Sequence, residues 1–261
     1  MKINLINTIK VDIKRAFLTW KFPLSIILGA LVCYFTLLFC GNINSDTVHT
    51  FLYLHDRSQS FLAYIVGIIP YVMCFYDDFS YGNIKNVLGR IDIYTYTISK
   101  TVVAIFSTIF AFGLGKLLFV FLHSLSHPLG TEETINMIAT NMLFINFIKD
   151  EQYLLYLVLT VLPKALYCAV LCQMAMLVSV LIHNRAIIFT VPIAIYYVLN
   201  FYINDVVEIE NFNFVHIFSG TAVLFQNDWF TLCYALVVAL ITHYIIYQLT
   251  VWILKGKICR G

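Results

Sequence analysis

Charged side chains are scarce in this sequence. Lysine, arginine, aspartate and glutamate make up only 11% of its 261 residues, while 61% of the residues are hydrophobic. A water-soluble domain of this length does not need so much apolar surface, whereas a chain surrounded by lipid does, because hydrocarbon then replaces water as the solvent for most side chains. The composition therefore predicts an all-α integral membrane protein rather than a soluble domain, and we expect no nucleic-acid partner.

The cysteines lack paired spacing. Six of the 7 lie in apolar runs and the last is in the C-terminal tail, so neither a disulfide framework nor a zinc site is indicated. Cys168 and Cys172 would share one helix face at a spacing of four, where buried cysteine behaves as a small apolar residue. We expect no metal bound by this chain.

A nucleotide-binding loop is also missing. The phosphate-cradling pattern G-x-x-x-x-G-K-[ST] does not occur. The nearest run, residues 113–116, lacks the first glycine and the final serine or threonine, and it lies inside an apolar stretch. Any ATP and Mg²⁺ would therefore be bound by a partner chain, and this chain is expected to hold no cofactor of its own.

The sequence contains no complete set of catalytic residues of a known membrane protease. Ser219-Gly220 with His243 is similar to the serine–histidine pair of rhomboid proteases, but isoleucine occupies the position of the required glycine. Glu132-Glu133 is similar to the acidic pair of CAAX-type membrane proteases, but it lies in a predicted loop rather than in a span. We therefore predict that the chain is not an enzyme.

Six apolar stretches are predicted to cross the membrane, because a helix needs about 20 apolar residues to span the hydrocarbon core. They cover residues 22–40, 61–76, 101–123, 155–182, 186–203 and 229–254, and the second is expected to be broken at Gly67 and Pro70. Residues 2–18 alternate charged and apolar side chains, which predicts an amphipathic helix lying at the interface. Residues 135–148 are expected to form a short surface helix. The apolar segment 212–225, between the fifth and sixth spans, is expected to form an outer re-entrant hairpin.

The distribution of basic residues predicts the orientation. The segments expected on one side contain Lys2, Lys10, Lys14, Arg15, Lys21, Lys85, Arg90, Lys100, Arg185, Lys255, Lys257 and Arg260. The opposite loops contain only Arg57 and Lys149. Cytoplasmic loops carry the excess of lysine and arginine, so we expect a multi-pass protein of the plasma membrane with both termini in the cytoplasm. Without an internal repeat or linker, residues 1–261 are interpreted as a single domain.

A polar segment, residues 76–100, separates the second and third predicted spans. Within it, Ile84, Val87 and Leu88 share one face of a short helix. One interpretation is an ordinary connector between two spans. The other is a coupling helix that docks into a groove of a partner motor, which the helical apolar spacing favours because a connector needs none.

This segment resembles the cytoplasmic segment between the second and third spans of ABC-2-type transporter permeases. The resemblance is carried by Asp78-x3-Gly82-x-Ile84-Lys85-Asn86-x-Leu88-x-Arg90, followed by Tyr94-x5-Lys100. The six-span layout extends it to the whole chain. The family often has glutamate where this chain has Asp78, and proline where it has Ile91-Asp92. Length and layout are most similar to small Gram-positive permeases that handle lantibiotics or other amphipathic peptides.

The resemblance implies a division of labour. Two permease subunits, identical or different, would pair in the bilayer above two separate ATPase subunits, whose closure on ATP pushes on the coupling helices. The residues implied in this coupling are Asp78, Tyr81, Gly82, Ile84, Lys85, Val87, Leu88 and Arg90. Of these, Tyr81, Ile84, Val87 and Leu88 would form the docking surface, and Lys85 and Arg90 its polar rim.

Two lysines fall inside predicted spans, where a cation is unfavourable unless it faces a cavity or reaches the interface. Lys116 lies about 10 Å from the outer end of its span at helical rise, a distance that a snorkelling lysine can nearly cover. Lys164 follows Pro163 and is deeper, so it either snorkels or lines the route of an anionic group. Both lysines are candidates for a substrate path.

The function predicted from these features is the membrane subunit of an ATP-driven ABC exporter. Its substrate would be hydrophobic or amphipathic, such as an antimicrobial or toxin-like peptide, a lipid or a drug. The alternative is a non-transporting immunity, sensor or assembly protein that acts in the membrane by binding alone. An ATPase that co-purifies with the chain would separate the two.

Overall fold

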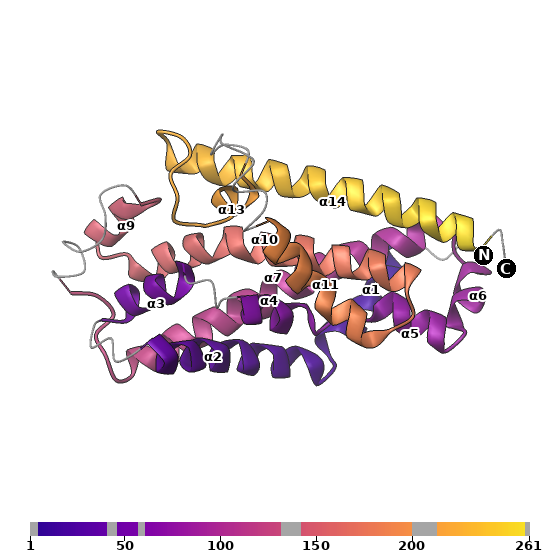
Figure 1. Ribbon diagram of the computed structural model, residues 1–261, viewed down its shortest axis with the longest axis horizontal. Coiled ribbons are helices and arrows are strands. Elements are labelled where there is room, and N and C mark those ends of the chain that lie inside the picture. The colour runs from indigo at the N-terminus through magenta and orange to yellow at the C-terminus, as the bar shows by residue number, and fades with distance from the viewer. Residues whose placement is uncertain (1–4, 41–45, 57–60, 132–141, 200–212, 259–261) are drawn as a thin grey trace.

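The computed structural model describes residues 5–40, 46–56, 61–131, 142–199 and 213–258 (Figure 1). Its helices are α1 (Leu5–Phe17), α2 (Lys21–Cys40), α3 (Thr47–Asp56), α4 (Phe61–Ile68), α5 (Cys74–Ser80), α6 (Asn83–Leu88), α7 (Ile93–Ser124), α9 (Ile145–Lys149), α10 (Tyr153–Leu181), α11 (Arg185–Tyr197), α13 (Phe214–Ile217) and α14 (Asp228–Ile258). Within these ranges the only β pairing is an isolated bridge between Met142 and Ala222. The all-α class is confirmed.

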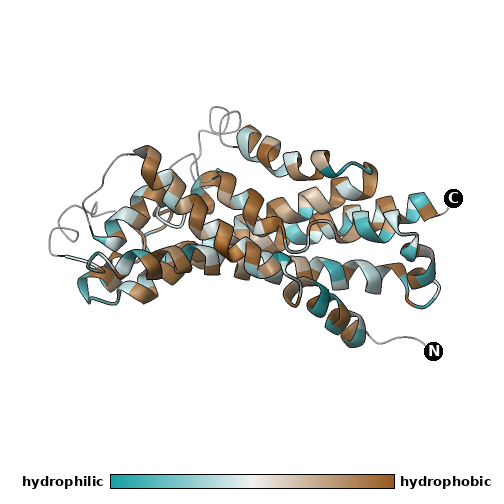
Figure 2. Ribbon diagram, turned by 90° about the horizontal axis from the view of Figure 1, so that it is seen from below, coloured by the Kyte–Doolittle hydropathy of each residue, from teal (hydrophilic) through white to brown (hydrophobic). Residues whose placement is uncertain are grey.

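Four helices, α2, α7, α10 and α14, have the length and apolar composition to cross a membrane. They run side by side along the long axis, with α2 and α14 on opposite flanks and α7 and α10 between them (Figure 1). α10 is the most buried of the four, because α7, α11 and α14 all pack on it. The long helices are mostly apolar through the middle, and polar residues gather toward the two ends (Figure 2).

The second predicted span, 61–76, is not one helix. α4 ends at Ile68 and α5 begins at Cys74, with turns between them that contain Pro70. Proline lacks a backbone N–H and clashes with the preceding turn, so it ends a helix that the apolar composition would otherwise continue. Neither α4 nor α5 alone is long enough to cross a bilayer.

The fifth predicted span, 186–203, is also shorter than expected. α11 has 13 residues, about 20 Å of helix, and ends at Tyr197. Residues 200–203 lie outside the described part of the chain. The described residues therefore contain four helices of spanning length rather than six, and two shorter apolar segments, α4–α5 and α11.

Two glycines allow α2 and α7 to pack closely. A Cβ atom on Gly115 would lie 3.2 Å from the Cα atom of Gly29, and one on Gly29 would lie 3.3 Å from the Cα of Gly115. Small residues at such a crossing let two membrane helices approach until their backbones touch. Gly115 belongs to the run that was compared with a nucleotide-binding loop, and its observed role is helix packing.

The two ends of the bundle differ in construction. The α6 end contains α1, α5, α6 and the C-terminal part of α14, and the α9 end contains α3 and α9 (Figure 1). Of the predicted surface helix 135–148, residues 135–141 lie outside the described residues, and α9 covers its end. Of the predicted hairpin 212–225, residue 212 lies outside the described residues, and the rest forms the four-residue α13 and a turn at Gly220, whose φ is 76°. A side chain at Gly220 would overlap the carbonyl oxygen of Thr160 in α10.

Candidate functional site: a buried charge cluster beside the short helix α6

Three charged side chains from three helices meet inside the α6 end. Lys100 of α7 places its Nζ 2.8 Å from Oδ2 of Asp78 in α5 and 3.7 Å from Oδ1 of Asp12 in α1. All three are buried, and Lys100 is only 1% exposed. Arg15 of α1 adds a longer contact, 3.4 Å from its Nη1 to Oδ1 of Asp78. We call these four residues the charge cluster.

Neighbouring side chains complete the cluster. The Tyr96 hydroxyl donates to Oδ2 of Asp78 at 2.8 Å, and the Ser99 hydroxyl donates to Oδ2 of Asp12 at 2.6 Å. The Lys100 ammonium also lies 5.0 Å from the centre of the Tyr96 ring, within cation–π distance. Two carboxylates and two cations balance in charge. Each buried ion is therefore compensated, and removing one partner would leave an uncompensated charge in a region that excludes water.

The cluster ties α1 to the elements on both sides of α6. Asp78 lies in α5, just before α6, and Lys100 lies in the first turns of α7, just after it. Asp12 and Arg15 place α1 against both. The ion pairs therefore connect α1 to both elements that flank α6.

The α6 segment itself presents a different face from the one expected. Ile84 is only 8% exposed and packs into the core of its own chain, while Val87 and Leu88 are half-buried against that core. Tyr81 is 71% exposed, and Arg90 is exposed as well. Ile84 therefore holds α6 in place instead of facing a partner. The side chain of Lys85 lies outside what the structure describes.

Both boundaries of this segment have local causes. Gly82 adopts a φ of 68°, a left-handed conformation that glycine takes without steric strain, and it separates α5 from α6. Asp92 caps α7: its Oδ2 accepts a hydrogen bond from the Thr95 backbone N–H at 3.0 Å, and its Oδ1 accepts from the Thr95 hydroxyl at 2.5 Å. These bonds lower the pKa of the Asp92 carboxyl. The cap gives Asp92 a structural role at the start of α7.

A cavity of 260 Å³ adjoins the charge cluster. Its walls include Arg15 and Lys21 from the α1–α2 side, and Asp77, Asp78 and Tyr81 from the α5–α6 side. The α1–α2 side thus contributes cations to the lining and the α5–α6 side contributes carboxylates. The charge cluster, α6 and this cavity together form the candidate functional site.

The two lysines predicted for a substrate path lie elsewhere, toward the α9 end. Lys164 is buried and donates to the backbone carbonyl oxygen of His55. Lys116 is also buried, 4% exposed, and its ammonium lies 5.9 Å from the centre of the Phe112 ring. Neither side chain extends along a lipid-facing surface in this structure, and neither reaches the charge cluster.

His55 lies at the centre of this second polar region. Its Nε2 donates to the carbonyl oxygen of Ser219 at 3.0 Å, which joins α3 to the turn after α13. Complete burial, followed by the nearby Lys164 cation, holds the pKa of His55 well below its usual value. His243, the histidine of the pair that is similar to that of rhomboid proteases, has its Nδ1 2.8 Å from Oε1 of Gln173. His243 and Ser219 therefore have separate partners.

Sequence reasoning named Asp78 as a coupling residue and Lys100 only as part of the pattern that carries the resemblance, and it missed Asp12, Arg15, Tyr96 and Ser99. One signal was present: Asp12 is the only acidic residue among residues 1–20, a segment otherwise rich in lysine and arginine. A single acidic residue in a basic amphipathic helix indicates a position where a buried carboxylate would need a cationic partner. Among the described residues, no group of three histidine, cysteine, aspartate or glutamate side chains could hold a metal ion.

Comparisons of this chain with protein-family models, with curated proteins and with solved structures gave no match.

Proposed function

We propose that this chain is the permease subunit of an ATP-driven exporter of the ABC-2 type, moving a hydrophobic or amphipathic substrate with the help of separate ATPase subunits. The observation that carries the proposal is the charge cluster, which joins α1 to the two elements flanking a short exposed helix. The likeness of residues 78–100 to the permease segment, argued from the sequence, supports the same function.

Because the charge cluster is buried, we favour a mechanical role for the segment around α6 over the role of a simple connector between two spans. Replacing a buried ion pair by apolar residues of similar volume is often neutral or stabilising. A buried ion cluster is therefore poorly explained by a contribution to stability alone. Here the ions join helices that are far apart in the sequence, with Arg15 and Asp78 separated by 63 positions. A rigid link at this place would carry a push on α6 into α1 and α7 together.

The proposed arrangement in the membrane completes the six-span layout. α4 with α5, and α11 with the residues that follow it, would supply the two crossings beyond the four long helices. Both termini and α6 would face the cytoplasm, in keeping with the basic residues gathered at that end. A second permease subunit would lie alongside in the plasma membrane, and ATP and Mg²⁺ would be bound only by the ATPase partners.

The proposed docking face differs from that expected from the sequence alone. It consists of the exposed residues Tyr81, Asn86 and Arg90, since Ile84 is occupied inside its own chain. An exposed tyrosine flanked by an arginine suits a protein partner, because tyrosine and arginine are the residues that most often dominate the binding energy of interfaces.

Affinity capture tests the proposal. The tagged chain, expressed in its own host and purified in mild detergent, is expected to bring down a protein with a nucleotide-binding P-loop, identified by mass spectrometry. Tyr81→Ala is expected to lower the yield of that protein at least about fivefold, because truncation of an interface anchor commonly costs more than 1 kcal/mol. Tyr244→Ala is the matched control, since Tyr244 is similarly exposed on α14 but remote from α6.

Purification without any P-loop protein would overturn the exporter proposal and favour an immunity, sensor or assembly protein that acts by binding alone. Equal loss of the partner from both tyrosine variants would overturn the assignment of α6 as the docking element.

A further inference from the structure

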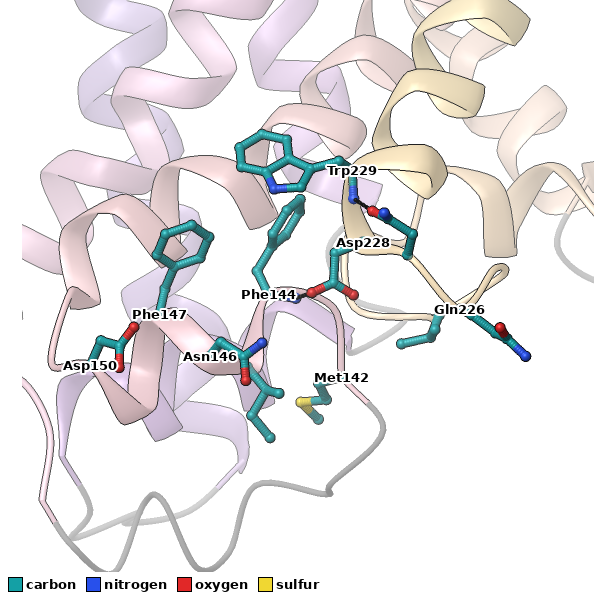
Figure 3. Close-up of a pocket in the computed structure, with 11 residues that line it drawn as sticks. Met142, Phe144, Asn146, Phe147, Asp150, Gln226, Asp228 and Trp229 are labelled. Carbon is teal, nitrogen blue, oxygen red and sulfur yellow. Dashed lines mark hydrogen bonds between the residues drawn. The ribbon is translucent and has the colours of Figure 1, made fainter.

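A cavity of 810 Å³ lies at the α9 end, far from the charge cluster. Figure 3 shows its two sides: Phe144, Asn146, Phe147 and Asp150 come from residues 142–150, and Gln226, Asp228 and Trp229 come from the loop before α14 and the start of that helix. The volume is within the range of small-molecule and peptide side-chain pockets, about 300–1,000 Å³. None of the residues discussed so far as site residues lines it.

The two sides are held together by backbone interactions. The Leu143 N–H donates to the Thr221 carbonyl oxygen at 3.1 Å, and the Phe144 N–H donates to Oδ2 of Asp228 at 3.0 Å. The isolated bridge between Met142 and Ala222 lies beside them. The cavity is therefore formed by two fixed segments that are distant in the sequence, and it does not depend on the orientation of one loop.

Aromatic rings form one part of the wall. The Trp229 ring centre lies 5.3 Å from that of Phe144 and 6.4 Å from that of Phe147, in edge-to-face arrangements. Phe144 is buried, but Trp229 remains 53% exposed. An exposed indole next to two phenyl rings offers a surface on which an apolar side chain or a cation can rest, because the ring faces carry negative charge density.

The charges of the wall all have one sign. Asp150 and Asp228 line the cavity, and no lysine, arginine or histidine is among the described residues that line it. Lys149 is next to Asp150 in the chain but does not line the cavity. This differs from the charge cluster, where every carboxylate has a cationic partner. The carboxylates and rings together are complementary to a ligand that is cationic and apolar at once.

We infer that this cavity is a binding site for a cationic amphipathic peptide, whose lysine or arginine groups face Asp150 and Asp228 and whose apolar side chains rest on Phe147 and Trp229. A peptide suits the site better than a small amine, because the carboxylates lie on two different segments and the cavity has room for more than one side chain. The identification of this peptide as the exporter's substrate rests on the proposed function. Binding of the peptide to the cavity does not require the ATPase.

Equilibrium binding to the purified chain in dodecyl maltoside tests the inference. The probe is a decapeptide of alternating lysine and leucine that carries an uncharged dye, and fluorescence anisotropy follows its binding at about 0.15 M salt. The matched probe has glutamate in place of each lysine, and protein-free micelles give the background. The lysine probe is expected to bind saturably, and the glutamate probe is not.

Neighbouring residues offer matched variants. Asp150→Asn is expected to weaken binding of the lysine probe about two- to fivefold, the range of an exposed ion pair. Glu151→Gln removes the same charge from the next residue, which is also exposed but does not line the cavity, so it should weaken binding less than Asp150→Asn does. Trp229→Ala should weaken binding about fivefold, whereas Trp252→Ala, an exposed tryptophan nearer the other end of α14, should not.

Equal binding of the lysine and glutamate probes would overturn the inference, as would equal effects of Asp150→Asn and Glu151→Gln in variants that elute as the parent does in size-exclusion chromatography. The outcome is separable from the proposed function. Binding that survives while no ATPase is captured would leave the site standing and remove the exporter, and capture of an ATPase by a chain without peptide binding would do the reverse.

Discussion

The two ends of this molecule use similar residues in opposite ways. At the α6 end, aspartates and aromatic rings enclose Lys100, and the ions are buried and balanced. At the α9 end, aspartates and aromatic rings line an 810 Å³ cavity with no cation in its described lining. Paired, buried charges fix helices relative to one another. Asp150 and Asp228 have no cation in the described lining, although Asp228 also accepts the Phe144 N–H, and we propose that both carboxylates face a ligand. We propose that the first arrangement transmits movement and that the second recognises a substrate.

Removing Lys100 is expected to have the largest effect on this comparison. Lys100→Met leaves Asp12 and Asp78 buried with one long contact to Arg15, so the free energy of unfolding should fall by about 3–5 kcal/mol. Thermal or denaturant unfolding in detergent measures the loss. Lys255→Met is the control, because Lys255 contacts Tyr94 at an exposed position.

A double variant sharpens the same test. Asp12→Asn with Lys100→Met removes one charge of each sign and leaves Asp78 facing Arg15. It should therefore be more stable than Lys100→Met alone, since residues of one ion network are not additive. Strictly additive losses would show that the four residues do not act as one cluster.

Lowering the pH is expected to loosen the α9 end through His55. The pKa of His55 is held well below its usual value of about 6.5 by burial and by Lys164. Below pH 6.5 the unfolded chain therefore binds a proton at this histidine, whereas the folded chain does not. The contribution of His55 is then fully present above pH 6.5 and is lost as the pH falls below it, by up to about 1.4 kcal/mol for each pH unit. Unfolding measured between pH 7.5 and 5 should show this slope, and His55→Gln should flatten it. An unchanged slope in that variant would mean that other groups cause it.

The smallest effect is expected at the solvent side of the charge cluster. The Arg15 side chain is 52% exposed and its contact with Asp78 is 3.4 Å long, so Arg15→Met should reduce the free energy of unfolding by less than about 1 kcal/mol. The same unfolding measurement checks it. A loss as large as that of Lys100→Met would mean that Arg15 is as important a counter-ion of Asp78 as Lys100 is.

The sequence predicted much of the helical framework. The long helices α2, α7, α10 and α14 fall on four of the six stretches expected to span, and short helices are found at residues 5–17 and 83–88, within the segments where they were expected. The break expected at Gly67 and Pro70 in the stretch 61–76 is found between α4 and α5, because proline ends a helix. The docking role of Ile84 stays a prediction. Helical spacing shows that Ile84, Val87 and Leu88 share a face but not what that face contacts, and the structure buries Ile84 in its own chain.

By itself, the sequence determined that this chain is helical and suited to a membrane, because hydropathy over about 20 residues is a local property that no tertiary contact can reverse. Only the tertiary structure decided which polar groups meet. Asp12 and Ser99 are 87 positions apart, and their contact follows from how α1 packs on α7. The cavity at the α9 end likewise exists only because residues 142–150 and 221–229 lie together. Pairing of charges and the shape of a cavity depend on long-range packing, and a pattern along the chain does not contain that information.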